Sequence, residues 1–216
     1  MTMLKENKGK LILSSLLTLL PIIVGLLLWD KLPDRIATHW GANGEPDGWS
    51  SKALAVFGLP AFVCVIQWVG AFFTAADPKS KNMNGKAIGM VYWLCPLISL
   101  FGCGFMYSNA LGITLSAAKL PSLLLGLIFI PIGNYLPKCK QNYTIGIKIP
   151  WTLDNEENWN ATHRFGGKVW VIGGLVIMLS AFLPDGYIIW VAMGMTAVMA
   201  LLPVLYSYLY FRKHQS

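Results

Sequence analysis

The chain alternates between long apolar blocks and short polar connections. A bilayer core of about 30 Å requires about 20 helical residues, because each residue adds about 1.5 Å along a helix. Six blocks approach or reach this length, at residues 11–29, 53–76, 87–108, 120–136, 169–183 and 187–211. The pattern therefore predicts an all-α integral membrane protein, a bundle of six transmembrane helices. The fourth and fifth blocks are near the short end of the range, so four spans with those two blocks lying along the surface is the alternative.

The distribution of Lys and Arg predicts the orientation of these spans. Membrane proteins concentrate Lys and Arg in their cytoplasmic segments. If the N-terminus is cytoplasmic, only four of the 17 Lys and Arg residues lie in segments outside the cell. These four are Lys31, Arg35, Lys52 and Lys119. We therefore expect both termini in the cytoplasm and a multi-pass protein of the cell membrane.

Composition narrows the class of protein further. The chain is 55% hydrophobic and 12% charged, whereas a soluble domain has about 25% charged residues. The net charge of +7 comes from residues between apolar blocks, which indicates contact with anionic lipid headgroups rather than with nucleic acid. None of the four cysteines lies in a segment placed outside the cell, so we predict no disulfide.

The connection at residues 30–52 holds most of the polar chemistry expected outside the cell. Residues 43–44 (Asn-Gly) and 46–48 (Pro-Asp-Gly) are turn signals. The segment before them, residues 35–40, is a candidate short strand. We expect the connection to form a compact cap on the outer face of the bundle.

Aromatic and acidic side chains in this cap suggest a binding site. Aromatic residues on loops often anchor a partner, and the candidates for binding an extracellular peptide are His39, Trp40, Glu45, Asp47 and Trp49. The cluster of His39 with the carboxylates of Asp34, Glu45 and Asp47 has the chemistry of a metal site, or it serves only to shape the turns. Because no ligand spacing supports a metal, we predict no metal and no cofactor.

The connection at residues 137–168 is expected on the cytoplasmic side. Residues 145–149 alternate as a strand does, and Pro150 would end that strand. The acidic residues at 154 and 157 resemble a capping box, so we predict a helix over residues 154–165 that the following two glycines end. Such a helix would lie flat on the membrane surface. It would either dock a cytoplasmic partner or only position the fifth span.

The spans carry no Asp, Glu, Lys, Arg or His deep in their interior. Intramembrane ionisable groups usually mark ion-coupled transport, so this composition counts against a secondary transporter. The amides Gln67, Asn109 and Asn134 leave open a channel or exporter for a small or lipid-like solute. The sequence has no nucleophile–base arrangement and no phosphate-binding loop, so we expect no enzyme. A reaction at the His39 carboxylate cluster is a third hypothesis.

Motifs in both long connections resemble the SdpI family. The C-terminal signature of the family is matched by Ile147-Lys-Ile-Pro-Trp-Thr152, Trp159, His163-Arg164-Phe165 and Lys168. The small N-terminal domain of unknown function that accompanies it is matched by Leu32-Pro33, His39-Trp40 and Gly44-Glu-Pro-Asp-Gly48. The chain departs from the signature at His163, where the family often has Asn, and at residues 148–149, where Arg-Thr is frequent. The resemblance divides the chain into an N-terminal half over residues 1–109, with the cap at 30–52, and an SdpI-like half over residues 110–216, with the loop at 137–168.

The resemblance also implies a function. The best-known member of the family protects a bacterium against a secreted killing peptide and holds a transcriptional repressor at the membrane. By this resemblance, the cap and the bundle would bind a secreted toxin peptide, and the cytoplasmic loop would bind a repressor protein. The residues expected to face that cytoplasmic partner are Pro150, Trp151, Thr152, Trp159, His163, Arg164 and Phe165. Membrane lipids would surround the spans.

Overall fold

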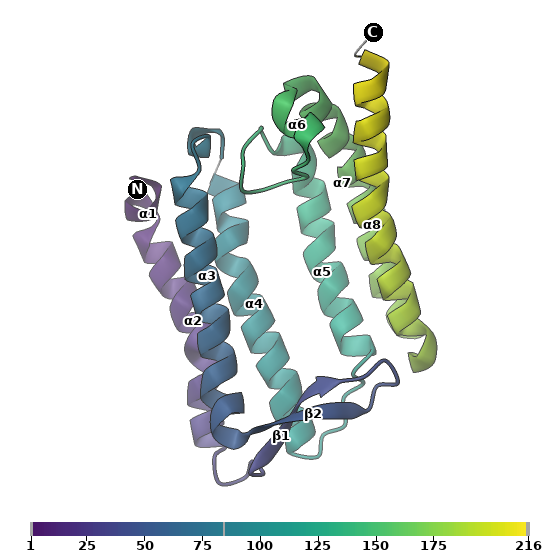
Figure 1. Ribbon diagram of the computed structural model, residues 1–216. Helices are drawn as coiled ribbons and strands as arrows, with labels where there is room; N and C mark the ends of the chain where they lie inside the picture. The colour runs from purple at the N-terminus through teal and green to yellow at the C-terminus, as the bar shows by residue number, and fades with distance from the viewer. Residues whose placement is uncertain (1, 84, 215–216) are drawn as a thin grey trace. The chain divides into compact units, whose positions relative to one another are not determined.

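The structure is a computed structural model that describes residues 2–83 and 85–214, and most of these residues are helical (Figure 1). In chain order the elements are α1 (Thr2–Glu6), α2 (Lys8–Leu27), β1 (Arg35–Trp40), β2 (Pro46–Ser51), the π-helical turn η1 (Leu54–Gly58), α3 (Leu59–Ala76), the short η2 (Ser80–Asn82), α4 (Gly85–Ala110), α5 (Lys119–Tyr135), η3 (Leu136–Lys138), α6 (Pro150–Asp154), α7 (Glu156–Leu179), η4 (Ser180–Phe182) and α8 (Asp185–His214).

Six helical segments in the described ranges are long and apolar enough to cross a membrane. They cover Lys8–Leu27, Leu54–Ala76, Ile88–Ala110, Lys119–Lys138, Glu156–Phe182 and Asp185–Lys213. The six predicted spans are therefore confirmed. The fourth and fifth spans are longer than their apolar blocks, because helical turns continue into the polar residues that flank them.

Contacts divide the chain into two compact units. The first comprises Met1–Ala75 and Gly89–Leu120, and the second comprises Ala76–Ile88 and Pro121–Ser216. The first unit therefore holds α2, the β-hairpin, α3 and most of α4. The second unit holds α5 to α8 together with the connection that follows α3.

In the first unit, hydrogen bonds around Gln67 join three apolar helices. The Gln67 amide accepts a hydrogen bond from Thr18 Oγ1 (2.7 Å) and donates one to Ser14 Oγ (2.5 Å). Ser99 Oγ donates to the backbone oxygen of Thr18 at 2.7 Å. A polar side chain facing hydrocarbon without a partner is costly, so bonded amides of this kind hold neighbouring spans together. The Gln67 amide is thus occupied by contacts between α2, α3 and α4.

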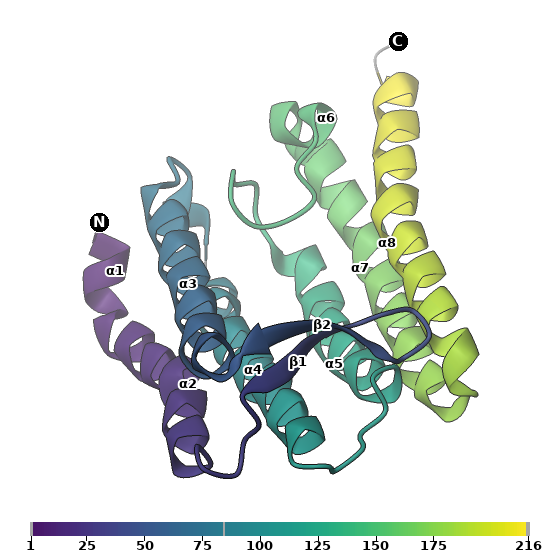
Figure 2. The ribbon, with the colours of Figure 1, turned by 60° about the horizontal axis from the view of Figure 1, so that its bottom comes forward.

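The cap predicted at residues 30–52 is an antiparallel hairpin of β1 and β2, which Figure 2 shows lying across the ends of the helices of the first unit. The strand predicted at residues 35–40 is confirmed. Ile36 is buried with Leu32, Val56 and Tyr107, which fixes the hairpin to the helix ends through an apolar core.

In the second unit, α7 corrects the prediction of a separate surface helix. The glycines at 166 and 167 do not end the helix, which runs unbroken from Glu156 to Leu179. A Cβ atom at Gly167 would lie 2.7 Å from the backbone oxygen of Gly133 on α5. The absence of a side chain lets the two helices approach closely, as small residues do between membrane helices. The two glycines therefore serve packing, and the prediction that they end the helix is wrong.

Two further details of the connection before α7 differ from the prediction. Residues 145–149 form an irregular segment instead of a strand, and Pro150 begins α6, a position that suits proline because the first helical residue needs no backbone donor. The N-cap of α7 is Asn155 instead of Asp154, and its side-chain oxygen accepts a hydrogen bond from the Asn158 amide at 2.8 Å.

The cytoplasmic location of both termini remains a prediction, and cysteine labelling tests it. Ala42 in the hairpin turn and Glu157 at the start of α7 are both exposed. In intact cells, we expect a membrane-impermeant maleimide to label Ala42→Cys but to label Glu157→Cys only after permeabilisation. The unmodified protein gives the background from its own cysteines. The opposite labelling pattern would show that the chain is inserted the other way round.

Candidate functional site

The hairpin, the end of α4 and the residues that follow α4 border a half-open cavity of about 500 Å³, which we name the hairpin pocket. Its lining consists of Pro33, Arg35, Ile36, Ala37, Trp40, Gly44, Glu45, Pro46, Trp49, Asn109, Ala110, Thr114 and Leu115. This size lies within the range of pockets that bind small molecules or side chains of a partner.

Two tryptophans form the aromatic part of the hairpin pocket. Trp40 is fixed by an edge-to-face contact with Phe105 of α4, with 4.7 Å between the ring centroids. Trp49 pairs across the hairpin with Ala37, whose small side chain leaves the indole uncovered, and Trp49 is 49% exposed. The pocket thus combines one fixed aromatic ring with one that is open to a ligand.

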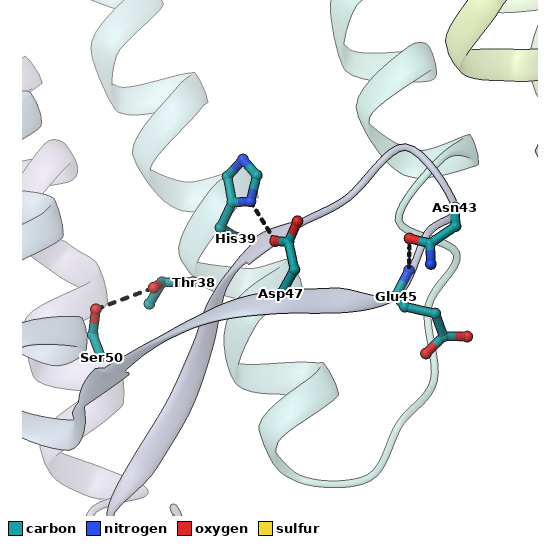
Figure 3. Close-up of polar contacts among 6 residues, drawn as sticks. All are labelled: Thr38, His39, Asn43, Glu45, Asp47 and Ser50. Carbon is teal, nitrogen blue, oxygen red and sulfur yellow. Dashed lines mark hydrogen bonds and ion pairs between the residues drawn. The ribbon is translucent and has the colours of Figure 1, made fainter.

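Two pairs of ionisable side chains form within the connection at residues 30–52. His39 Nδ1 donates to Asp47 Oδ1 at 2.5 Å, and Figure 3 shows the two side chains pointing toward each other. Lys52 Nζ lies 3.4 Å from Asp34 Oδ1. Figure 3 also shows that the side chain of Glu45 turns away from the pair of His39 and Asp47.

The predicted cap residues therefore separate into two groups. Trp40, Glu45 and Trp49 line the hairpin pocket, whereas His39 and Asp47 bond to each other across the two strands. The four residues considered as a metal cluster do not gather. Within residues 2–83 and 85–214, no three His, Cys, Asp or Glu side chains lie close enough to share an ion.

In the second unit, the connection between η3 and α7 is held by a buried pair of rings. His163 stacks on Trp159 with 4.0 Å between centroids. His163 Nε2 accepts a hydrogen bond from the Ile147 amide (2.9 Å), and Nδ1 donates to the Trp159 backbone oxygen (2.8 Å). The Trp159 indole donates to the backbone oxygen of Cys139 at 2.7 Å. This pair therefore clamps both ends of the irregular segment at residues 139–149, which we name the clamped loop.

Asp77 and Asn142, which the sequence analysis did not select, complete the clamped loop. Asp77 Oδ2 accepts hydrogen bonds from the Tyr143 amide (2.8 Å) and Thr144 Oγ1 (2.7 Å). Asn142 Oδ1 accepts from the backbone amides of Thr144 (2.9 Å) and Ile145 (2.7 Å). A single acid directly after an apolar block was the available signal for Asp77, but its partners lie 66 and 67 residues away.

The thiol of Cys139 belongs to the same structure. It is buried, and it accepts a hydrogen bond from Asn142 Nδ2 at 3.4 Å. Burial raises the pKa of the Cys139 thiol, although the hydrogen bond from Asn142 opposes part of this shift. The thiol therefore stays protonated at neutral pH, which is typical of a structural cysteine rather than a reactive one.

The seven residues expected to face a cytoplasmic partner differ in accessibility. Thr152, Trp159 and His163 are buried, and their contacts lie within the protein. Trp151 is half-buried, with ring centroids 5.2 Å from Tyr208 and 5.9 Å from Phe211. Phe165 is half-buried against Tyr206, and Pro150 and Arg164 are exposed.

The six spans, the hairpin and the clamped loop together define a multi-pass helical protein of the cell membrane. Residues 138–207 match the SdpI/YfhL protein family, and residues 16–64 match a domain of unknown function, DUF1648. The chain is 30% identical to the immunity protein SdpI of Bacillus subtilis (strain 168) over 208 residues, which cover 94% of this chain and 97% of that protein. The chain therefore belongs to the SdpI/YfhL family. No solved structure matches it.

Removing the Asp77 carboxylate tests the clamped loop. Hydrogen bonds to a charged group contribute about 1.5–3 kcal/mol each, so Asp77→Ala should lower the free energy of opening the loop by more than about 1.4 kcal/mol. We expect trypsin to cleave the detergent-solubilised protein after the exposed Lys140 or Lys148 about tenfold faster or more. Asp154→Ala, which removes an exposed acid outside the clamped loop, is the matched control. Equal cleavage rates in both variants would show that Asp77 does not hold the loop.

Proposed function

We propose that the protein is a membrane immunity protein, which protects the cell that carries it against a secreted antimicrobial peptide. The observation that supports this function is its relationship to the immunity protein SdpI, which extends over 94% of the chain. Because the relationship includes the hairpin, the spans and the clamped loop, it concerns the whole architecture rather than one shared domain.

The hairpin pocket is the proposed peptide-binding site. Trp40, Glu45 and Trp49 line it, and exposed aromatic rings beside polar groups are typical of surfaces that bind peptides. His39 and Asp47 support the site through their bond across the two strands. In the predicted orientation the hairpin faces the cell exterior, where a secreted peptide arrives.

Binding is better supported than the alternative of a solute channel or exporter. That alternative relied in part on amides inside the spans. Gln67 is buried, and both ends of its amide are engaged by side chains of α2. An amide engaged in this way contributes to helix association rather than to a hydrated path.

A survival assay tests the proposed immunity. A peptide-sensitive bacterium that produces this protein should survive a killing peptide, drawn from a panel of such peptides, at doses that kill the same strain with an empty vector. Trp49→Ala should lower the highest peptide concentration that the cells survive about tenfold. Exposed aromatic residues at a binding site often contribute more than about 1.4 kcal/mol to the binding free energy.

The matched control for Trp49→Ala is Trp190→Ala. Trp190 is an exposed tryptophan on α8, outside the hairpin pocket. The control should protect as well as the unmodified protein, and both variants should reach the membrane in equal amounts. Survival that does not depend on the gene for any peptide in the panel would reject the immunity function.

We also propose that the cytoplasmic end binds a protein partner, which the resemblance suggests is a transcriptional repressor. The accessible members of the predicted set support a smaller contact surface than the sequence suggested. Pro150 and Arg164 are exposed, and Trp151 and Phe165 are half-buried. The buried Thr152, Trp159 and His163 would shape this surface from beneath.

Charge reversal at Arg164 tests the partner surface. In cells that contain a reporter gene controlled by a small repressor encoded beside this gene, peptide treatment should raise reporter expression. Arg164→Glu should abolish this response and leave survival unchanged. Lys168→Glu reverses another exposed cation one turn further along α7 and should retain the response. A response that persists in Arg164→Glu would show that the partner does not bind at this surface.

A further inference from the structure

Two charged side chains in the hairpin pocket lack the pairing seen in the rest of the hairpin. Asp34 pairs with Lys52, and Asp47 pairs with His39. Arg35 and Glu45 both line the pocket, and neither has an ion-pair partner within the described part of the chain. The pocket therefore holds one uncompensated cation and one uncompensated anion.

The strand register places these two charges at opposite ends of the pocket. Arg35 begins β1 and lies opposite Ser51, whereas Glu45 directly precedes Pro46, the partner of Trp40 at the other end of the strand. Five residue steps separate Arg35 from Trp40, and a strand rises about 3.3 Å per residue, so the ends are roughly 16 Å apart. Between them, the lining is mostly aromatic and aliphatic.

From this arrangement we infer that the hairpin pocket binds an extended peptide segment with a fixed charge polarity. A basic group of the peptide lies at Glu45, a carboxylate lies at Arg35, and apolar side chains between them contact Trp40 and Trp49. This inference rests on the proposed function, since it names the class of ligand for the same site.

The length of the strand that separates the two charged residues favours a peptide over a lipid headgroup. A zwitterionic headgroup such as phosphoethanolamine also carries an anion and a cation, but only a few bonds separate them. Such a group is too short to lie along the roughly 16 Å of strand from Arg35 to Trp40. An extended segment of about five residues spans that distance and fills the apolar middle.

Synthetic pentapeptides test the inference with the full-length protein in detergent. The probe is an N-acetylated peptide with lysine first, then leucine, phenylalanine, alanine and leucine, with a free carboxylate at its C-terminus. A second peptide replaces lysine by norleucine, and a third replaces the carboxylate by a carboxamide. Because each charge-assisted contact contributes about 1 kcal/mol at a partly exposed site, each replacement should weaken binding about fivefold.

Two conservative variants assign each charge of the peptide to one end of the pocket. In Glu45→Gln, replacing the lysine should no longer change affinity, whereas replacing the carboxylate should still cost about fivefold. In Arg35→Gln, replacing the carboxylate should no longer change affinity, whereas replacing the lysine should still cost about fivefold. Lys31→Gln, at an exposed cation outside the pocket lining, should behave like the unmodified protein. The inference would be overturned if neither replacement in the peptide changed its affinity for either variant. It would also be overturned if the unmodified protein bound all three peptides equally or bound none of them.

Two further results separate this inference from its alternatives. Binding of phosphatidylethanolamine vesicles that depends on both Arg35 and Glu45, with no binding of any peptide, would assign the pocket to lipid and overturn the inference. In the survival assay, Arg35→Gln and Glu45→Gln could protect as well as the unmodified protein. That result would overturn the proposed charge polarity of the bound peptide and would not contradict the immunity function. The predicted peptide binding without any protection would support the pocket and reject immunity.

Discussion

Hydrocarbon offers no hydrogen bonds, and this constraint determines where the protein can place polar chemistry. Every backbone group inside a span must bond within its own helix, which accounts for the six long helices. A polar side chain inside the bundle must find a protein partner, as Gln67 does with Thr18 and Ser14. The remaining polar chemistry is confined to the ends of the helices, where the hairpin and the clamped loop are found.

The clamped loop and the hairpin meet this constraint in different ways. The clamped loop is closed, because Asp77, Asn142 and His163 direct their polar atoms at its backbone and leave few groups for a ligand. The hairpin is open, because Arg35 and Glu45 border a cavity and have no ion-pair partner in the described residues. Polar groups that bond within the protein favour a structural role for the clamped loop, whereas charges without an ion-pair partner favour recognition by the hairpin.

The sequence predicted the parts of this arrangement that depend on local signals. Length and hydropathy were sufficient for the six spans, and turn residues at 43–48 were sufficient for a strand at 35–40. The continuity of α7 could not be predicted, because two consecutive glycines either break a helix or admit a neighbour, and only the position of Gly133 decides between these outcomes. The sequence also could not predict which charges of the hairpin stay without an ion-pair partner, because the strand register determines which charges pair.

The departure of His163 from the family pattern has a chemical explanation in the clamped loop. The position requires one acceptor, for the amide of Ile147, and one donor, for the backbone oxygen of Trp159. A neutral imidazole with its proton on Nδ1 meets both requirements, and the carboxamide of asparagine, which the family often has there, also carries a donor and an acceptor. Histidine adds a ring that stacks on Trp159. Histidine at this position therefore supplies both the hydrogen bonds and the ring contact that hold the clamped loop.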